Sequence, residues 1–562
     1  MRGDGLAGGE GGADRLGELI PAALRGMAAG IAERGGPVPA GGPAAVAAAL
    51  VAERGEPARV AAALVGDHGG AGAVLATAER GEPAPVAPVL VGDHGGAGAV
   101  LAAAERGEPA GVAAALVGDH GGPGAVMSTA ERGGLDAASS RNQLPRHGVG
   151  AEAALEELSR LLAAGSADPA DPACAAHLHC PPLAVAVAAD VVASALNPSM
   201  DSWDQAPVAS ELEREFTAGI ARLCYPDAET PDAVVTTGGT ESNLLGLLLA
   251  RERDPGVQPV CGANAHHSVA RAAWLLGLPA PIVVPCEGDR LLPDALAEVV
   301  TPRSVVVATA GTTNTGTLDP LPAIAAICRR SGARLHVDAA YGGMALCSDT
   351  LKTKLAGLEL ADSVALDLHK FGWQPVAAGL FAAREAADLA ALTVRAEYLN
   401  ADDDTEAGLP DLLGRSIRTS RRPDAFRMAV TVHALGTDGL GALVERCCTT
   451  ATEVAARVEE HPGLRLWGAP ELSTVVLRPV GADETGDDEL VARVRRALLE
   501  AGTAVIGRAS LPTGPGGADQ LWLKLTLLHP HTTGDDYGPL LDRIAATAGA
   551  ELVAGRESPV AS

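Results

Sequence analysis

Short apolar runs alternate with helical patterns over the middle of this chain, and this alternation constrains the fold more than any other feature. Runs typical of β-strands occur at 233–237, 259–263, 281–285, 304–309, 334–338, 363–367 and 379–383. Helical patterns begin between them, near residues 240, 267, 293 and 320. Alternation of strand and helix is typical of a parallel sheet covered by helices. The sequence therefore predicts an α/β fold with a mostly parallel central sheet.

The order of elements changes after about residue 431. A long helix is followed by apolar runs at 473–479, 503–509 and 521–527 and by a last helix that ends near residue 548. Strands grouped in this way predict a smaller, C-terminal α+β domain. We place the large domain at 207–430, the small domain at 431–550 and a tail at 551–562.

An internal repeat occupies the N-terminal part of the chain. The strings GDHGG and AERGEP each occur three times, at intervals of 26 residues. Solenoids have periods of this length, but here each unit has one short Ala/Val/Leu run that is broken by Gly and Pro. We favour an insertion created by tandem duplication and place it at 51–141, after an N-terminal helical segment at 1–50.

Charge and composition exclude several classes of function. The chain has 43 Lys and Arg against 70 Asp and Glu, and the net charge of −27 repels nucleic acid and anionic membranes. The longest apolar run, 183–196, is too short to cross a bilayer. Nine cysteines without a C-x-x-C pair, and no leader at the start of the chain, indicate the cytoplasm. We expect neither a nucleic acid partner nor a membrane partner.

Three groups that bind ligands in other proteins stand at the carboxyl ends of the expected strands. TGGT at 237–240 joins a strand to a helix, which suits a phosphate, although a tight turn capped by Thr240 explains it equally well. Asp338 and Lys370 follow two later strands. Taken alone, each has an ordinary explanation, a helix-capping Asp and a solvated Lys. Together they indicate pyridoxal 5'-phosphate (PLP), which needs a Lys, an acid and a phosphate site.

From about residue 148 to 548 the sequence resembles the group II PLP-dependent amino acid decarboxylases. This family has the aspartate aminotransferase fold, called fold type I. The resemblance lies in the motifs TTGGTESNLLGLLLAR, HVDAAYGG and DLHKFGWQPVAAG, which occur in the order seen in the family. The segments HLHCPP and NPSMDSWDQAPVASELE are most similar to L-2,4-diaminobutyrate decarboxylases.

The resemblance implies a role for each matching residue. Lys370 carries PLP as a Schiff base, Asp338 pairs with the pyridine nitrogen, and His266 stacks on the ring. The other cofactor contacts that it implies are Gly239 and Thr240 at the phosphate, Ala340 on the opposite ring face, and Thr313 and His369 close by.

The resemblance also implies an obligate homodimer with shared active sites and a dimerisation segment at 142–206. Tyr398 falls in the mobile catalytic loop of the family, which reaches into the neighbouring subunit and protonates the substrate carbon. An ordinary surface loop is the alternative explanation of this Gly- and Asp-rich stretch.

A second cluster of candidate ligands is Cys174, His177, His179 and Cys180, which lie within seven residues. Such spacing occurs in zinc sites, but alternate residues of an extended segment face opposite ways, so we expect no metal. In the family this segment borders the substrate pocket. The resemblance therefore makes His177 and Cys180 candidates for contact with the substrate.

The function that the sequence predicts is the PLP-dependent decarboxylation of an L-amino acid, with L-2,4-diaminobutyrate giving 1,3-diaminopropane. A lysine- or ornithine-type decarboxylase and an aromatic amino acid decarboxylase are the nearest alternatives. From another class, a catalytically silent scaffold whose repeats bind a partner is also considered. The complete set of Lys370, Asp338 and His266 argues against that scaffold.

Overall fold

The computed structural model describes residues 12–41, 145–393, 410–512 and 517–557, with the single residues 399, 403 and 406. The chain divides into two units, Ala47–Val149 and the remainder. The 26-residue repeats and residues 558–562 of the expected tail lie outside the described residues, whereas 551–557 belong to the last helix. The fold below is that of the second unit.

A seven-stranded sheet forms the core of the large domain, in the order β1-β9-β8-β7-β6-β2-β3. The strands are β1 (Asp232–Thr236), β2 (Gln258–Gly262), β3 (Ile282–Val284), β6 (Ser304–Thr309), β7 (Arg334–Asp338), β8 (Ser363–Asp367) and β9 (Gly379–Ala383). β9 is antiparallel to both of its neighbours, and all other pairs in this sheet are parallel. The expectation of a mostly parallel sheet is confirmed, and each strand lies within one residue of its predicted position.

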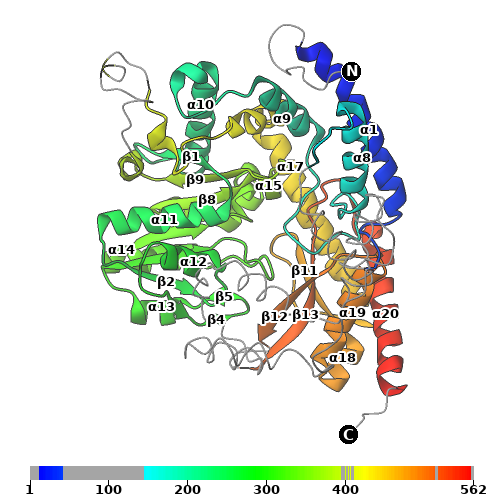
Figure 1. Ribbon diagram of the computed structural model, residues 1–562. Helices are drawn as coiled ribbons and strands as arrows, with labels where there is room; N and C mark the ends of the chain where they lie inside the picture. The colour runs from blue at the N-terminus through cyan, green and yellow to red at the C-terminus, as the bar shows by residue number, and fades with distance from the viewer. Residues whose placement is uncertain are drawn as a thin grey trace, which may run out of the picture. The chain divides into compact units, whose positions relative to one another are not determined.

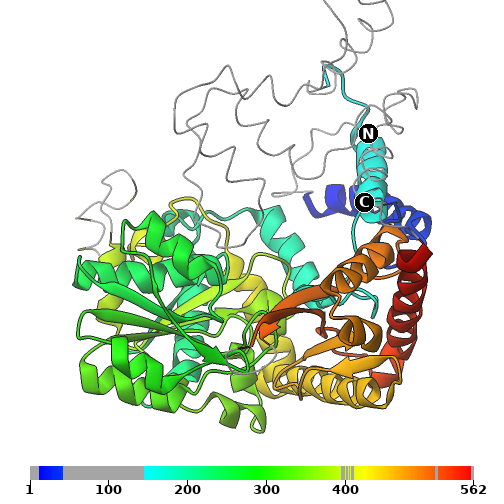
Figure 2. The ribbon, with the colours of Figure 1, turned by 90° about the horizontal axis from the view of Figure 1, so that it is seen from below.

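Helices cover both faces of this sheet (Figure 2). They are α10 (Pro207–Cys224), α11 (Gly239–Arg253), α12 (Ser268–Leu275), α13 (Pro293–Val299), α14 (Leu321–Ser331) and the short α15 (Leu368–Phe371). Every residue of β6 and β8 is buried, because a strand covered on both faces has no side open to solvent. A short hairpin of β4 (Cys286–Glu287) and β5 (Arg290–Leu291) lies between β3 and α13 in the sequence.

The small domain is built on a four-stranded antiparallel sheet in the order β10-β11-β13-β12. Its strands are β10 (Leu464–Leu466), β11 (Thr474–Pro479), β12 (Gly507–Pro512) and β13 (Asp519–Thr526). Its helices are the long α17 (Asp424–Glu460), α18 (Val480–Thr485), α19 (Asp488–Glu500) and α20 (Gly538–Glu557), drawn in yellow to red in Figure 1. The strand expected at 503–509 begins later, because Val505 forms a bridge with Cys174 instead of joining β12.

Short 3-10 turns complete the described chain, at Trp203–Gln205, Gly343–Cys347, Leu351–Leu355, Leu358–Leu360, Ala386–Leu392, Leu413–Arg415 and Gly534–Tyr537. Within the described residues, none of the helices has both the length and the apolar character that a membrane span requires.

Three N-terminal helices precede the large domain, α1 (Gly12–Arg34), α8 (Ala151–Ala164) and α9 (Ala184–Leu196). α1 and α8 lie side by side (Figure 1) and run parallel, because contacts of later residues in α1 fall on later residues in α8. Their backbones approach closely where a Cβ atom on Gly26 would lie 2.0 Å from the carbonyl oxygen of Glu156, and one on Gly30 2.0 Å from that of Arg160. Glycine is therefore required at both positions.

The parallel packing of α1 and α8 leads to a prediction about the repeats. Because the two helices are parallel, the segment that joins the end of α1 to the start of α8 has to span the length of α8. At 1.5 Å per residue this length is about 21 Å. Deleting 51–133 leaves 42–50 and 134–150, which at up to ~3.3 Å per residue still span that distance. We therefore expect the deletion variant to keep its turnover and, within a few degrees, its thermal midpoint. A loss of both, together with loss of the expected dimer, would show that the repeats belong to a subunit interface.

Candidate active site

The residues expected to carry the chemistry meet at one edge of the large sheet. β1, β2, β6, β7 and β8 run in the same direction, and their carboxyl ends lead to Gly238, His266, Thr313, Asp338 and Lys370. In open α/β sheets this edge is where ligands bind. The sheet therefore gathers five segments that are far apart in the sequence.

The turn between β1 and α11 is a glycine cradle. A Cβ atom on Gly239 would lie 2.9 Å from Cβ of Ala340 and 3.3 Å from Oδ2 of Asp367. Gly238 has a φ of 152°, and a Cβ atom there would lie 3.0 Å from Cε1 of His369. Because the first N–H groups of a helix have no partner within it, this turn presents free donors to an anion.

Glu241 fixes the first turn of α11 without occupying the cradle. Its Oε2 accepts hydrogen bonds of 2.7 Å from both the N–H and the O–H of Thr237. Its Oε1 lies 3.5 Å from Nε of Arg418, so the charge of the carboxylate is paired. Thr240, at the mouth of the turn, is exposed and free to contact a ligand.

Asp338 ends β7 and is 6% exposed. One carboxylate oxygen accepts a hydrogen bond of 2.7 Å from Nδ2 of Asn243, and the other accepts one of 3.1 Å from the N–H of Ala340. Both carboxylate oxygens of Asp338 are therefore held in place, one by α11 and one by the backbone that follows β7. Ala340, two residues further on, is itself buried beside the glycine cradle.

Lys370 lies on α15 and forms a buried ion pair. Its Nζ is 2.9 Å from Oδ2 of Asp367, and Nε2 of His369 is 3.5 Å from the same oxygen. The side chain of Asp367 is only 2% exposed, and its Oδ1 is buried with no hydrogen-bond partner. An unpaired carboxylate oxygen costs free energy, so the vicinity of Asp367 is suited to a further donor.

The other lysines of the chain do not compete for this role. The sequence holds four, and three of them are engaged elsewhere. Lys352 pairs with Asp349 on the surface, and Lys354 donates to the carbonyl of Glu471. Lys524, in the small domain, donates to the carbonyl of Thr313 at 2.8 Å.

His266 follows β2 and is a half-buried imidazole. Its Nδ1 lies 2.8 Å from Oγ of Ser268, and its ring centroid lies 4.0 Å from that of His267. Burial lowers the pKa of His266 and the neighbouring His267 lowers it further, whereas Asp338 acts in the opposite direction. The ring of His266 is therefore neutral near pH 7.

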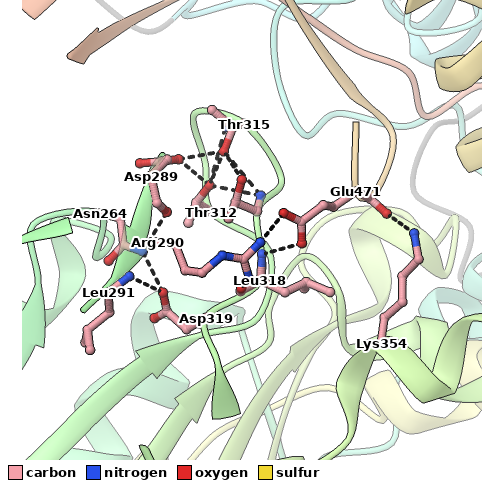
Figure 3. A network of polar contacts seen from close by, with 11 residues as sticks. Asn264, Asp289, Arg290, Leu291, Thr312, Thr315, Leu318, Asp319, Lys354 and Glu471 are labelled. Carbon is pink, nitrogen blue, oxygen red and sulfur yellow. Dashed lines mark hydrogen bonds and ion pairs between the residues drawn. The ribbon is translucent and has the colours of Figure 1, made fainter. Parts of the chain in front are cut away.

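A network of buried polar groups holds the loop that carries Thr313 (Figure 3). Asp289 accepts hydrogen bonds from the hydroxyl groups of Thr312, at 2.5 Å, and Thr315, at 2.7 Å. Burial raises the pKa of Asp289, and these two hydrogen bonds oppose that rise. Asp319 accepts a hydrogen bond of 2.8 Å from the last backbone N–H of β6. The loop is thus held on both sides, and Thr313 is exposed between the anchors.

Lys524 couples this loop to the small domain. It is 6% exposed, and burial lowers the pKa of its amine to about 8, although Asp289 acts in the opposite direction. Burial lowers the pKa of His177, which lies on the segment before Cys180, and the charge of Lys524 lowers it further.

Cys180 forms a hydrogen bond with the segment that carries Lys370. Its Sγ donates to the carbonyl of His369 at 3.2 Å, and burial raises the pKa of the thiol to about 12. Cys180 is therefore a neutral thiol that packs against the segment of Lys370. Among the described residues, Cys174, His177, His179 and Cys180 do not assemble into a group able to hold a metal ion.

Tyr398 lies outside the described residues, so its role remains a prediction. The roles of His177 and Cys180 in substrate contact also remain predictions. Asp367, Asn243 and Lys524 were not expected from the sequence. Only Asp367 had a clear signal, because it ends β8 three residues before Lys370 and so lies at the same edge of the sheet.

The residues at this edge fit PLP. Lys370 is an amine for the aldehyde, the two glycines and the start of α11 form a cradle for the phosphate, and Asp338 is an anion for the ring nitrogen. The buried, unpartnered Oδ1 of Asp367 and the cradle that a Cβ atom would fill are both consistent with a ligand between these elements.

Comparison with known proteins decides the family. The family model described as the pyridoxal-dependent decarboxylase conserved domain matches residues 137–479. The chain belongs to this family. The match includes the glycine cradle, His266, Asp338 and Lys370, and it establishes a PLP-dependent amino acid decarboxylase of fold type I whose cofactor is PLP.

Individual relatives agree with this assignment. L-2,4-diaminobutyrate decarboxylase of Rhizobium meliloti (strain 1021) is 38% identical over 425 residues, which are 72% of this chain and 83% of the relative. L-2,4-diaminobutyrate decarboxylase of Acinetobacter baumannii is 33% identical over 444 residues, 72% of this chain and 86% of the relative.

A solved structure has the same fold. The glutamate decarboxylase domain of diaminobutyrate-pyruvate transaminase and L-2,4-diaminobutyrate decarboxylase from Vibrio parahaemolyticus superposes with a TM-score of 0.63 at 29% identity, over 75% of this chain and 90% of that one. The PLP complex of Oryza sativa TDC with tryptamine, at 20% identity, a TM-score of 0.67 and 74% and 91% coverage, shares the fold alone.

Proposed function

We propose that this decarboxylase acts on L-2,4-diaminobutyrate and releases 1,3-diaminopropane and carbon dioxide. The observation that carries the proposal is the similarity to two curated relatives of that name, each over 72% of this chain. The sequence beside Tyr398 adds support, since Asp402, Asp403 and Asp404 are consecutive. Their negative charge suits a substrate that has a second ammonium group.

The residues of the site divide the work of this reaction. Lys370 would hold PLP covalently, and the glycine cradle with Thr240 would hold the phosphate. His266 and Ala340 would bind the ring of PLP, one on each face. When bound, PLP takes up the electron pair that the departing carboxylate leaves behind.

Asp338 and Tyr398 hold and deliver protons in this scheme. Opposite charges ~4 Å apart at an effective dielectric near 20 interact by about 4 kcal/mol, which is roughly three pKa units. Asp338 therefore keeps a proton on the ring nitrogen at neutral pH. Tyr398 donates a proton to the Cα atom of the substrate after carbon dioxide leaves.

A substrate panel tests the proposal. Purified protein is offered L-2,4-diaminobutyrate, L-ornithine, L-lysine, L-glutamate, L-aspartate, L-tyrosine and L-tryptophan, and both carbon dioxide and the amine are measured. Because one methylene group changes kcat/KM by about 10- to 200-fold, we expect diaminobutyrate to exceed ornithine by at least ~10-fold. Preference for ornithine, lysine or an aromatic or acidic amino acid would overturn the substrate. Absence of release from every substrate would instead favour the scaffold.

We also propose a cytoplasmic homodimer. All nine cysteines are free, which suits a reducing compartment. A hollow of about 310 Å³ between α9, α10 and the start of α17 is lined by apolar residues that include Leu196, Val208 and Phe426. Leu196 and Val208 are 69% and 72% exposed, and this surface continues the expected dimerisation segment at 142–206. A second copy of the chain is the occupant that we propose for it.

Mixed dimers give a sharp prediction for Tyr398. If the loop of one subunit completes the site of the other, a Tyr398→Phe subunit paired with a Lys370→Ala subunit has one intact site. A mixture in equal amounts is then expected to recover about a quarter of wild-type activity, whereas each variant alone makes almost no amine. The matched control mixes Tyr398→Phe with wild-type-like Lys352→Ala. No recovery in the first mixture, or normal amine yield from Tyr398→Phe alone, would contradict the shared site.

A further inference from the structure

A chain of buried hydrogen bonds connects His266 with Asp338 through Asn243 and Ser268. Nδ2 of Asn243 is 2.7 Å from Oδ2 of Asp338 and 2.8 Å from Oγ of Ser268, and that Oγ is 2.8 Å from Nδ1 of His266. Oδ1 of Asn243 is 2.9 Å from Nε2 of His336. Asn243 is fully buried, and Ser268 and His336 are each 1% exposed. Water therefore does not substitute for any of these partners.

The charge of Asp338 fixes the direction of the first bonds. An ionised carboxylate only accepts, so the amide nitrogen of Asn243, and not its oxygen, has to face Asp338. The amide oxygen then faces His336, whose Nε2 has to carry a hydrogen atom. Nδ1 of His336 lies 2.9 Å from Oγ of Ser363 and accepts its hydrogen atom. Burial lowers the pKa of His336 to about 4, which agrees with this neutral form.

The same constraint continues to the ring of His266. Asn243 uses its second hydrogen atom on Ser268, so the hydroxyl hydrogen of Ser268 is left to point at Nδ1 of His266. The backbone N–H of Ser268 also points at this nitrogen, at 3.4 Å. Two donors at Nδ1 leave no place for a hydrogen atom there, so a neutral His266 carries its hydrogen on Nε2.

We propose that the charge of Asp338 sets the tautomer of His266. Asn243 and Ser268 are positioning residues that transmit this effect through the orientation of their hydrogen bonds. The inference rests on the proposed function, which assigns His266 and Asp338, the two ends of this series of hydrogen bonds, to the same cofactor. The order has a chemical use, because a neutral ring with Nε2–H stacks beside Lys370 without adding a second positive charge. It also leaves Nε2–H as a donor on the side of the ring away from Ser268.

Nitrogen NMR of the full-length purified protein tests the order directly. Long-range proton–nitrogen spectra of protein labelled with ¹⁵N-histidine distinguish the two neutral tautomers and the charged ring, and a His266→Gln variant assigns the signal. We expect the Nε2–H tautomer in the wild-type protein. An Nδ1–H tautomer or a charged ring near pH 7 would overturn the proposal. The NMR measurement of the tautomer does not depend on turnover. Failure of this proposal can therefore be told apart from failure of the proposed substrate.

Two matched serine variants test the path. Ser268→Ala removes a hydroxyl donor from His266, and we expect the tautomer ratio to move about fivefold toward Nδ1–H, the worth of one hydrogen bond. Asp338→Asn removes the charge and is expected to move the ratio in the same direction. Ser363→Ala removes the equivalent bond to His336, outside the path, and is expected to leave His266 unchanged. Equal ratios in wild type, Ser268→Ala and Asp338→Asn would overturn the transmission.

Discussion

Lys370→Ala is expected to abolish both the visible absorbance of bound PLP and turnover, with a loss of about three or more orders of magnitude in kcat. Lys370 is the lysine that lies at the carboxyl edge of the sheet beside the glycine cradle, and its Nζ is already held 2.9 Å from a buried carboxylate. Alanine removes the amine and leaves Asp367 without this partner. Absorbance spectra and carbon dioxide release measure the two effects.

Lys352→Ala is the matched control for that variant. Lys352 is 52% exposed and pairs with Asp349 on the surface, so its loss is expected to change neither signal. A cofactor link that borohydride still reduces in Lys370→Ala would show that another lysine binds PLP.

Asp338→Asn is expected to lower kcat by about 10²- to 10³-fold while PLP remains bound. The amide keeps the shape of the side chain but removes the charge that holds a proton on the ring nitrogen. Steady-state kinetics and the absorbance of the holoenzyme measure the effect. PLP whose ring nitrogen is methylated carries a permanent charge, so reconstituting the variant with it is expected to restore much of the lost rate.

Two outcomes would contradict the role of Asp338. Wild-type kcat in Asp338→Asn would show that the charge is not needed. No gain from the methylated cofactor, in a variant that binds it normally, would show that Asp338 acts in another way.

The sequence predicted the large sheet well because its strands, apart from the edge strand β3, are buried along almost their whole length. A run such as Ser304–Thr309 has no polar face, and turns bound it on both sides, so its limits are readable. The limits of β12 could not be predicted from the sequence, because the apolar pattern includes Val505, which pairs with Cys174 instead of joining β12. Only the tertiary structure decides which part of such a run joins the sheet.

The residues of the candidate site that lie in recognisable motifs could be predicted from the sequence. Lys370 and Asp338 occupy strand ends, and strand ends share one edge of a parallel sheet. Asn243 was not predictable, because its position inside α11 looks like an ordinary buried helix residue. Its importance comes from β7 and α12, which supply Asp338, His336 and Ser268 from distant parts of the chain. Lys524 likewise acquires its contact with the Thr313 loop only when the small domain packs on the large one.

The most direct test of the catalytic assignment is to locate the lysine that binds PLP. The purified protein is reduced with borohydride and digested, and the pyridoxyl label is mapped by mass spectrometry. With four lysines in the sequence, Lys352, Lys354, Lys370 and Lys524, the answer is unambiguous. The structure predicts the label on Lys370 alone. A label on Lys524 or on either surface lysine would contradict the assignment.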